Sequence, residues 1–181
     1  MHPEYGHALT PPLEEDDHIQ GATHASIVLM EYCDYQSPQS GQAYLIVQEL
    51  QRQLGEQLCF VFRHFPLAKP FQAQRAAEAA EAAHAQGKFW LMHDTLFAHQ
   101  QALEDADLVE YAVAINLDIP RFLRALSTRV HVDRVQMDVE SGRRHGVEET
   151  PTSFISVRYK GTQNLKALLM ALLAIDNSQS I

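Results

Sequence analysis

The sequence predicts an α/β domain, and three features of its pattern support that prediction. Residues 27–32 form a nearly continuous apolar run with β-branched members, as expected of a strand buried on both faces. A helical pattern follows over residues 38–54, and a second apolar run occupies residues 58–63. Strand, helix and strand in this order form a βαβ unit with parallel strands and a right-handed crossover. Helical patterns then dominate until strand character returns after Pro151.

Composition limits the classes of function. A chain of 181 residues with 46% hydrophobic residues can bury one substantial core, so we expect one domain. The net charge of -9 disfavours a nucleic acid or an anionic membrane surface as partner, because both repel an acidic protein. The longest apolar segment, residues 165–175, is too short to cross a bilayer, so we expect no membrane insertion. The first residues lack the features of a secretory signal, which favours a cytoplasmic location.

Local signals set the bounds of the helices. Ser37 is expected to cap the first helix, with Pro38 at its first position and Gly55 after its end. Five further helices are expected at residues 73–85, 88–100, 105–116 with Asp105 as cap, 120–127 and 130–144. A strand at 152–157, a short strand near Tyr159 and a helix at 164–175 complete the pattern.

The domain boundaries follow from this pattern. Residues 1–20 contain three prolines and an acidic run at 14–17, so we expect a polar N-terminal arm that docks late or stays mobile. The folded domain should then span residues 21–175, with a helical insertion at about 71–144 and a C-terminal tail at 176–181.

Several motifs together resemble one family. The stretch from Met30 to Ser40 is similar to the first strand and redox loop of DsbA-like thioredoxin-fold proteins, in which the loop usually ends Cys-Pro-Tyr-Cys. Here it ends Ser-Pro-Gln-Ser. The other matching segments are residues 62–67, 76–80, 87–90, 92–94, 146–147 and 150–152. The opening at 17–21 is similar to the start of thioredoxin-like domains found alone or fused to bacterial sodium/proton antiporters.

The resemblance implies a thioredoxin fold with a central mixed β-sheet and a DsbA-like helical insertion. It also implies membership of the thiol-disulfide oxidoreductase family, although serine stands at both cysteine positions, Ser37 and Ser40. Disulfide exchange needs a thiolate to attack and a second thiol to resolve, so we expect redox inactivity at this motif.

In place of disulfide exchange, we expect this protein to have a binding role. Pro151 aligns with the family's cis-proline, whose neighbouring backbone can pair with an extended peptide. The resemblance thus implies a groove for a peptide or protein segment, used in binding or regulation. Its residues are Ser37, Pro38, Gln39, Ser40, Thr150 and Pro151.

Two alternatives stay open. Ser37 at a helix N-terminus could bind the thiolate of glutathione, as in kappa-class transferase and isomerase relatives of this fold. The serines could also be engineered substitutions in an ordinary oxidoreductase, a question that the native coding sequence would settle. Apart from glutathione, no cofactor is expected.

The remaining reactive side chains are interpreted as structural. Cys33 is expected to be a small buried residue and not a displaced nucleophile, and it should lie too far from Cys59 to form a disulfide. The ten histidines show no zinc-ligand spacing, so no metal site is predicted. Arg75, Glu78 and Glu81 are interpreted as a solvated helix face.

Overall fold

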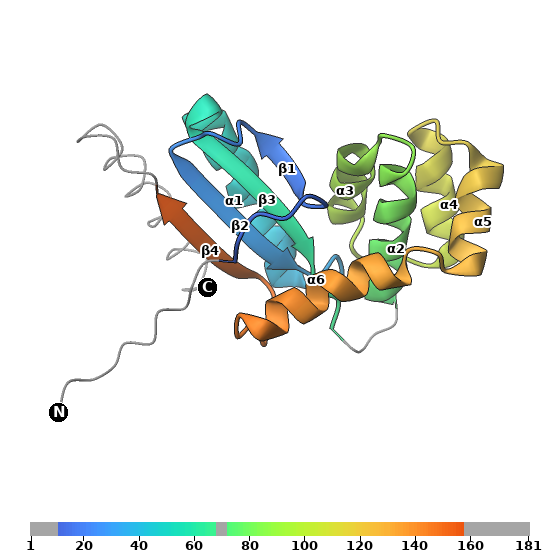
Figure 1. Ribbon diagram of the computed structural model, residues 1–181. Coiled ribbons are helices and arrows are strands. Elements are labelled where there is room, and N and C mark those ends of the chain that lie inside the picture. The colour runs from blue at the N-terminus through green and yellow to red at the C-terminus, as the bar shows by residue number, and fades with distance from the viewer. Residues whose placement is uncertain (1–10, 68–71, 158–181) are drawn as a thin grey trace.

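A computed structural model of the chain describes residues 11–67 and 72–157. Four strands within these residues form one mixed sheet in the order β1-β3-β2-β4 (Figure 1). Their bounds are β1 His18–Gly21, β2 Ile27–Cys33, β3 Leu58–His64 and β4 Thr152–Val157. β2 and β3 run parallel, and β1 and β4 pair antiparallel with β3 and β2. The predicted mixed sheet and its βαβ unit are therefore confirmed.

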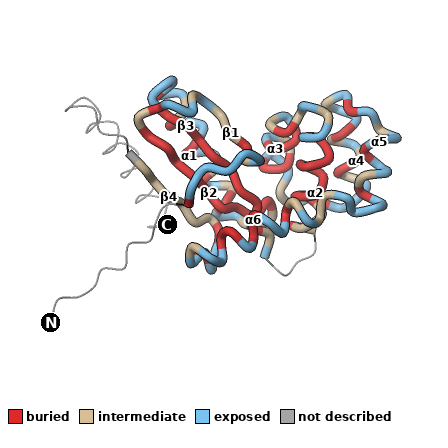
Figure 2. The backbone as a smooth tube through the Cα atoms, viewed as in Figure 1, coloured by how far each residue is buried: buried red, intermediate tan, exposed pale blue. Residues whose placement is uncertain are grey.

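The central strand β2 separates two apolar layers. Successive side chains of a strand point to opposite faces of the sheet. Ile27 and Leu29 accordingly belong to the larger core cluster, and Val28 and Met30 belong to the smaller one. Both faces are covered, so all seven residues of β2 are buried, as its continuous apolar run predicts (Figure 2).

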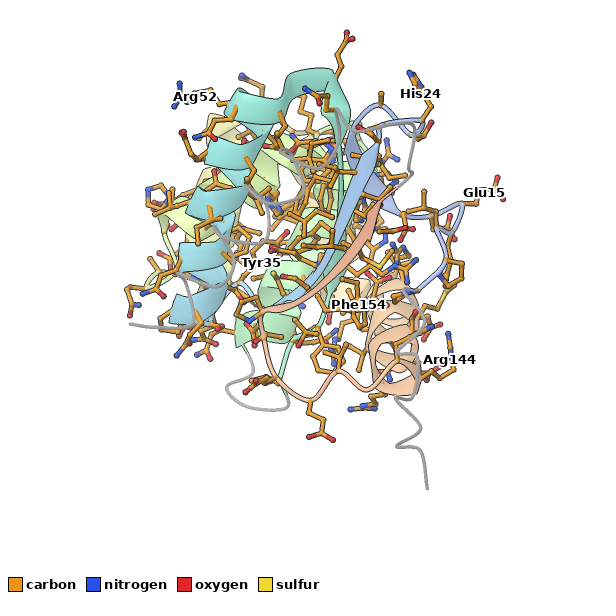
Figure 3. All side chains as sticks on the ribbon, turned by 90° about the vertical axis from the view of Figure 1, so that its left-hand side faces the viewer. Glu15, His24, Tyr35, Arg52, Arg144 and Phe154 are labelled. Atoms are coloured by element: carbon orange, nitrogen blue, oxygen red, sulfur yellow. The ribbon has the colours of Figure 1, made fainter. Side chains whose placement is uncertain are left out.

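Helix α1 covers the larger core. It spans Pro38–Leu54, with Ser37 as N-cap and Gly55 after its last residue, as expected. Val47, Leu50 and Leu54 form its buried stripe. Figure 3 shows side chains filling the space between α1 and the sheet, while Arg52 projects from the far end of the helix toward solvent. A 3-10 turn at Gly55–Gln57 then leads into β3.

Within the described residues, five helices form the insertion between β3 and β4. They are α2 Gln72–His84, α3 Phe89–Ala98, α4 Asp105–Ala114, α5 Ile119–Thr128 and α6 Val132–Arg144. Helices α2 to α5 gather beside the β1 edge of the sheet, and α6 returns to the sheet (Figure 1). Helix α6 places Val139 in the smaller core. The expected strand near Tyr159 and the expected helix at 164–175 lie outside the described residues.

Two local expectations differ from the structure. The N-cap of α4 is Glu104, one residue before the expected Asp105, and its backbone N–H donates to Asp107 Oδ2 at 2.9 Å. The folded domain also begins earlier than residue 21, because β1 lies within the stretch expected to be an arm. His18 at the start of β1 is 3% exposed, and Asp17 accepts hydrogen bonds from the buried guanidinium of Arg63.

Candidate functional site

The Ser-Pro-Gln-Ser motif forms the start of α1. Ser37 has extended backbone angles, and its hydroxyl oxygen accepts a hydrogen bond from the backbone N–H of Ser40 at 3.2 Å. Pro38 follows at the first helical position, where a missing N–H costs nothing. Pro38 and Gln39 are exposed and Ser37 is half-buried, whereas Ser40 is fully buried. The motif therefore presents three residues to solvent and directs one inward.

The loop before β4 meets the start of this helix. The Thr150–Pro151 peptide bond is cis. The Ser37 hydroxyl lies 3.2 Å from the carbonyl oxygen of Thr150 and 3.3 Å from Gln39 Oε1, so its single proton is shared between two protein acceptors. Thr150 Oγ1 is buried and has no hydrogen-bond partner among the described residues. The structure thus brings Ser37 and Thr150 together across 113 positions of sequence.

Hydrogen bonds from several elements hold the loop between β2 and α1. Asp34 accepts from the backbone N–H groups of Gln36 at 2.7 Å and Leu67 at 3.0 Å. The side chain of Gln100, just beyond α3, donates to the carbonyl oxygens of Tyr35 and Ser37 at 2.9 and 2.8 Å. These bonds fix the backbone from which α1 starts.

A buried acid lies on β2, beneath the start of the helix. Glu31 is 3% exposed, and burial raises its pKa to about 7, although a hydrogen bond from Ser153 opposes the shift. Ser153 Oγ donates to Glu31 Oε1 at 3.0 Å, and Cys33 Sγ lies 3.7 Å from Glu31 Oε2. Sequence analysis missed this carboxyl. The sequence feature that could have identified Glu31 is that it is a single acidic residue within an otherwise apolar strand.

The two cysteines lie apart and away from the surface. Burial raises the pKa of the Cys33 thiol well above its ordinary value, and the neighbouring Glu31 adds to the shift. Cys33 belongs to the larger core cluster and Cys59 to the smaller, on opposite faces of the sheet. Both are buried and neither forms a disulfide, as the sequence predicts.

The expectation of a solvated face on α2 is wrong. Glu78 and Glu81 are 1% and 2% exposed, because α2 is sandwiched between other elements of the domain. Glu78 accepts a hydrogen bond of 2.7 Å from Arg129 of the α5–α6 turn. The carboxylate of Glu81 lies within hydrogen-bonding distance of His18 and His64. Arg75 pairs with Asp105 at 2.9 Å.

These features define the class of protein. A family model described as Thioredoxin matches residues 13–173, so the chain belongs to the thioredoxin family, with the helical insertion of its DsbA-like members. The fold is shared with a thioredoxin-like oxidoreductase from Silicibacter pomeroyi, with a TM-score of 0.72, 20% identity, and 93% and 95% of the two chains covered. BdbD from Bacillus subtilis gives a TM-score of 0.69 at 16% identity, covering 94% of each chain.

More similar sequences occur within larger proteins. The chain is 41% identical over 170 residues to a protein named Na(+)/H(+) antiporter NhaA 3 from Salinispora tropica, covering 92% of this chain and 26% of that protein. It is 36% identical over 151 residues to Na(+)/H(+) antiporter NhaA of Herminiimonas arsenicoxydans, covering 83% and 24%. The chain therefore spans about a quarter of the length of these relatives. No helix within residues 11–67 and 72–157 has the length and apolar character needed to span a membrane.

Proposed function

We propose that this domain binds an extended peptide or protein segment at the surface formed by residues 37–40, 150 and 151, and performs no disulfide exchange there. The observation that carries the proposal is the hydrogen bond between the Ser37 hydroxyl and the Thr150 carbonyl oxygen. It holds the start of α1 against the loop before β4, with oxygen at the position of the family's attacking sulfur.

The chemistry of the two hydroxyls supports redox inactivity. A serine hydroxyl stays protonated at neutral pH unless a base removes its proton. Among the residues that the structure describes, the groups that hydrogen-bond to the Ser37 hydroxyl are a backbone N–H, a backbone carbonyl and the amide of Gln39, and none of them is a base. Cys33 cannot replace the missing thiol, because its sulfur is buried and burial raises its pKa.

The exposure pattern supports binding. Pro38 and Gln39 are exposed beside the half-buried Pro151, and β4 starts at the next residue. A segment lying in this position can add main-chain hydrogen bonds in the manner of strand addition. Thr150 Oγ1 is buried without a partner among the described residues, and this hydroxyl lies next to the proposed binding surface.

The relatives suggest a class of partner. Similar sequences make up about a quarter of proteins named as sodium/proton antiporters. We therefore propose that the bound segment belongs to a water-exposed part of such an antiporter and that binding regulates it. A segment of this kind would be neutral or basic, because the chain carries a net charge of -9.

Glutathione is the alternative ligand, and one observation makes it the weaker candidate. A thiolate bound at the tip of α1 would need the Ser37 proton, which is already directed at the Thr150 carbonyl and Gln39 Oε1. Titration with millimolar glutathione tests this alternative directly, since it predicts saturable binding that Ser37→Ala abolishes.

The test of peptide binding uses amide NMR spectra and a blocked variant. Peptides that cover the water-exposed segments of a related antiporter are titrated into the protein. We expect shifts confined to residues around 37–40 and 150–152. Ser37→Cys alkylated with N-ethylmaleimide should prevent binding, whereas the same adduct at Leu123→Cys, on the exposed face of α5, should not. Binding that persists with the adduct at position 37 would refute the proposed surface.

A further inference from the structure

Three potential metal ligands meet where β1, β3 and α2 come together. His18 is the first residue of β1, His64 is the last residue of β3, and Glu81 lies on α2. The Nε2 atoms of His18 and His64 lie 2.6 and 2.9 Å from the same oxygen, Glu81 Oε1. The three ligand atoms lie within 4.8 Å of one another, and all three residues are buried. The residues are 46 and 17 positions apart in sequence, so no local motif reveals the cluster.

We propose that His18, His64 and Glu81 form a binding site for a divalent transition-metal ion, with Zn²⁺ as its best match. Two imidazole nitrogens and one carboxylate oxygen are a donor set that Zn²⁺ prefers, and three protein ligands leave the fourth position for water. The proposal is independent of peptide binding at Ser37, because the two sites share no residue.

Metal binding needs a change of tautomer at each histidine. Glu81 is an acceptor only, so both Nε2 atoms carry the hydrogen in the metal-free protein. A metal would take both Nε2 lone pairs, and each ring would then carry its hydrogen on Nδ1. His64 Nδ1 is buried with no hydrogen-bond partner among the described residues, so a proton moved there displaces no existing partner, and the bonds from the two Nε2–H groups to Glu81 give way to the metal.

The surrounding charges leave Glu81 under-compensated. The nearest arginine or lysine in the described part of the chain is Arg134, whose Nε lies 3.9 Å from Glu81 Oε1. Arg134 binds more closely to another acid, because its Nη1 donates to Asp138 Oδ1 at 2.6 Å. The single positive charge of Arg134 thus lies near two buried carboxylates, those of Asp138 and Glu81. A divalent cation at the cluster would compensate the negative charge of Glu81. Asp138 also accepts the backbone N–H of His64 at 2.9 Å, which fixes the strand end that carries this ligand.

Two of the three ligand separations need only a small opening, and the two Nε2 atoms, which lie within 4.8 Å of each other, must reach the same spacing. Ligands at Zn–N and Zn–O distances of about 2.0 to 2.2 Å in a tetrahedral site lie roughly 3.3 Å from one another. The present separations of 2.6 and 2.9 Å would open by about half an ångström. His18 lies on a four-residue edge strand, and its ring stacks on Phe89 with the ring centroids 3.4 Å apart, so this stack holds the imidazole beside Glu81.

The test titrates chelator-treated protein with Zn²⁺ and Co²⁺. Native mass spectrometry should show one ion per chain, and Zn²⁺ should raise the thermal midpoint. Glu81→Gln keeps the side-chain size and should weaken binding at least hundredfold, and His18→Gln should do the same. His24→Gln and His99→Gln change exposed histidines and should leave binding unchanged.

The spectrum of Co²⁺ bound to the wild-type protein tests the site without any variant. It should show visible d–d bands without sulfur charge transfer, and NMR should show two shifted imidazole N–H signals. Failure to take up an equimolar ion would overturn the proposal. So would a sulfur charge-transfer band, or binding that survives Glu81→Gln and disappears on replacing the exposed histidines.

Discussion

The Ser37 hydroxyl lies 3.2 Å from the carbonyl oxygen of Thr150 and also accepts the backbone N–H of Ser40 at the same distance. This one side chain therefore caps α1 and ties it to the loop before β4. Serine meets both demands with a single oxygen, because a hydroxyl both donates and accepts.

Removing the Ser37 hydroxyl should destabilise the domain. Ser37→Ala loses the cap and the bond to Thr150, and we expect the free energy of unfolding to fall by about 1 kcal/mol. Urea unfolding followed by circular dichroism measures the change. Gln42→Ala, at an exposed position in the first turns of α1, is the control and should have little effect. Equal stability of Ser37→Ala and the wild-type protein would show that these bonds contribute nothing.

Neither cysteine should react in the native protein. Cys33 and Cys59 are 3% and 0% exposed, and burial raises the pKa of the Cys33 thiol. We expect Ellman's reagent to detect no thiol before unfolding and two thiols in guanidinium. Ser37→Cys, which places a thiol at the half-buried helix cap, is the positive control. A thiol that reacts rapidly in the folded protein and is lost in Cys33→Ala would instead identify a displaced nucleophile.

Glu31 should make stability depend on pH. Its pKa is raised from 4.5 to about 7 in the folded protein, so the folded state holds this proton where the unfolded chain has released it. The contribution of Glu31 to the free energy of unfolding should therefore fall by about 3 kcal/mol as pH rises from 4.5 to above 7. Glu31→Gln should remove this part of the pH dependence.

Urea unfolding at several pH values measures the effect as the difference between the wild-type protein and Glu31→Gln. Glu110→Gln, at an exposed position on α4, should leave the pH profile unchanged. A difference between wild type and Glu31→Gln that stays constant with pH would contradict the raised pKa.

Arg63 should hold the segment before β1 in place. Its guanidinium donates to Asp17 at 2.6 and 2.9 Å and to the carbonyl oxygen of Pro12 at 2.7 Å. Arg63→Met leaves the buried Asp17 carboxylate without this partner, and we expect a loss of about 3 to 5 kcal/mol. Amide hydrogen exchange should accelerate first in β1.

The matched control for Arg63→Met is Arg52→Met, which breaks an exposed pair with Glu49 at the end of α1. It should leave hydrogen exchange in β1 unchanged. Exchange in β1 that is equally slow in Arg63→Met and the wild-type protein would show that other contacts hold the segment.

Local chemistry made much of the fold predictable. Ser37 and Pro38 predict the start of α1, because helix capping depends on residues that are neighbours in the sequence. The strand β2 was predictable because burial on both faces leaves a continuous apolar run. The strand β1 was not predictable, since it has four residues and little apolar character. It forms through pairing with β3 and burial of His18, which are contacts between distant parts of the chain.

The buried polar and charged side chains were the part of the structure that the sequence could not predict. The acids of α2 look solvent-facing in an alanine-rich helix, but nine of its thirteen residues are buried because elements of the insertion and the sheet enclose it. The contact of Glu81 with His18 and His64 joins three elements and leaves no local spacing. At the candidate site, Ser37 was identified from its motif, whereas its contact with Thr150 depends on how α1 and β4 come together.

A redox assay on the wild-type protein and the Ser37→Cys, Ser40→Cys double variant tests the central claim most directly. The wild-type protein should neither reduce insulin nor oxidise a dithiol peptide above background. The double variant should gain a titratable thiol with a pKa below the usual 8.5 and measurable exchange, because the helix N-terminus stabilises a thiolate there. Disulfide exchange by the wild-type protein, or a double variant with no such thiol, would contradict the account.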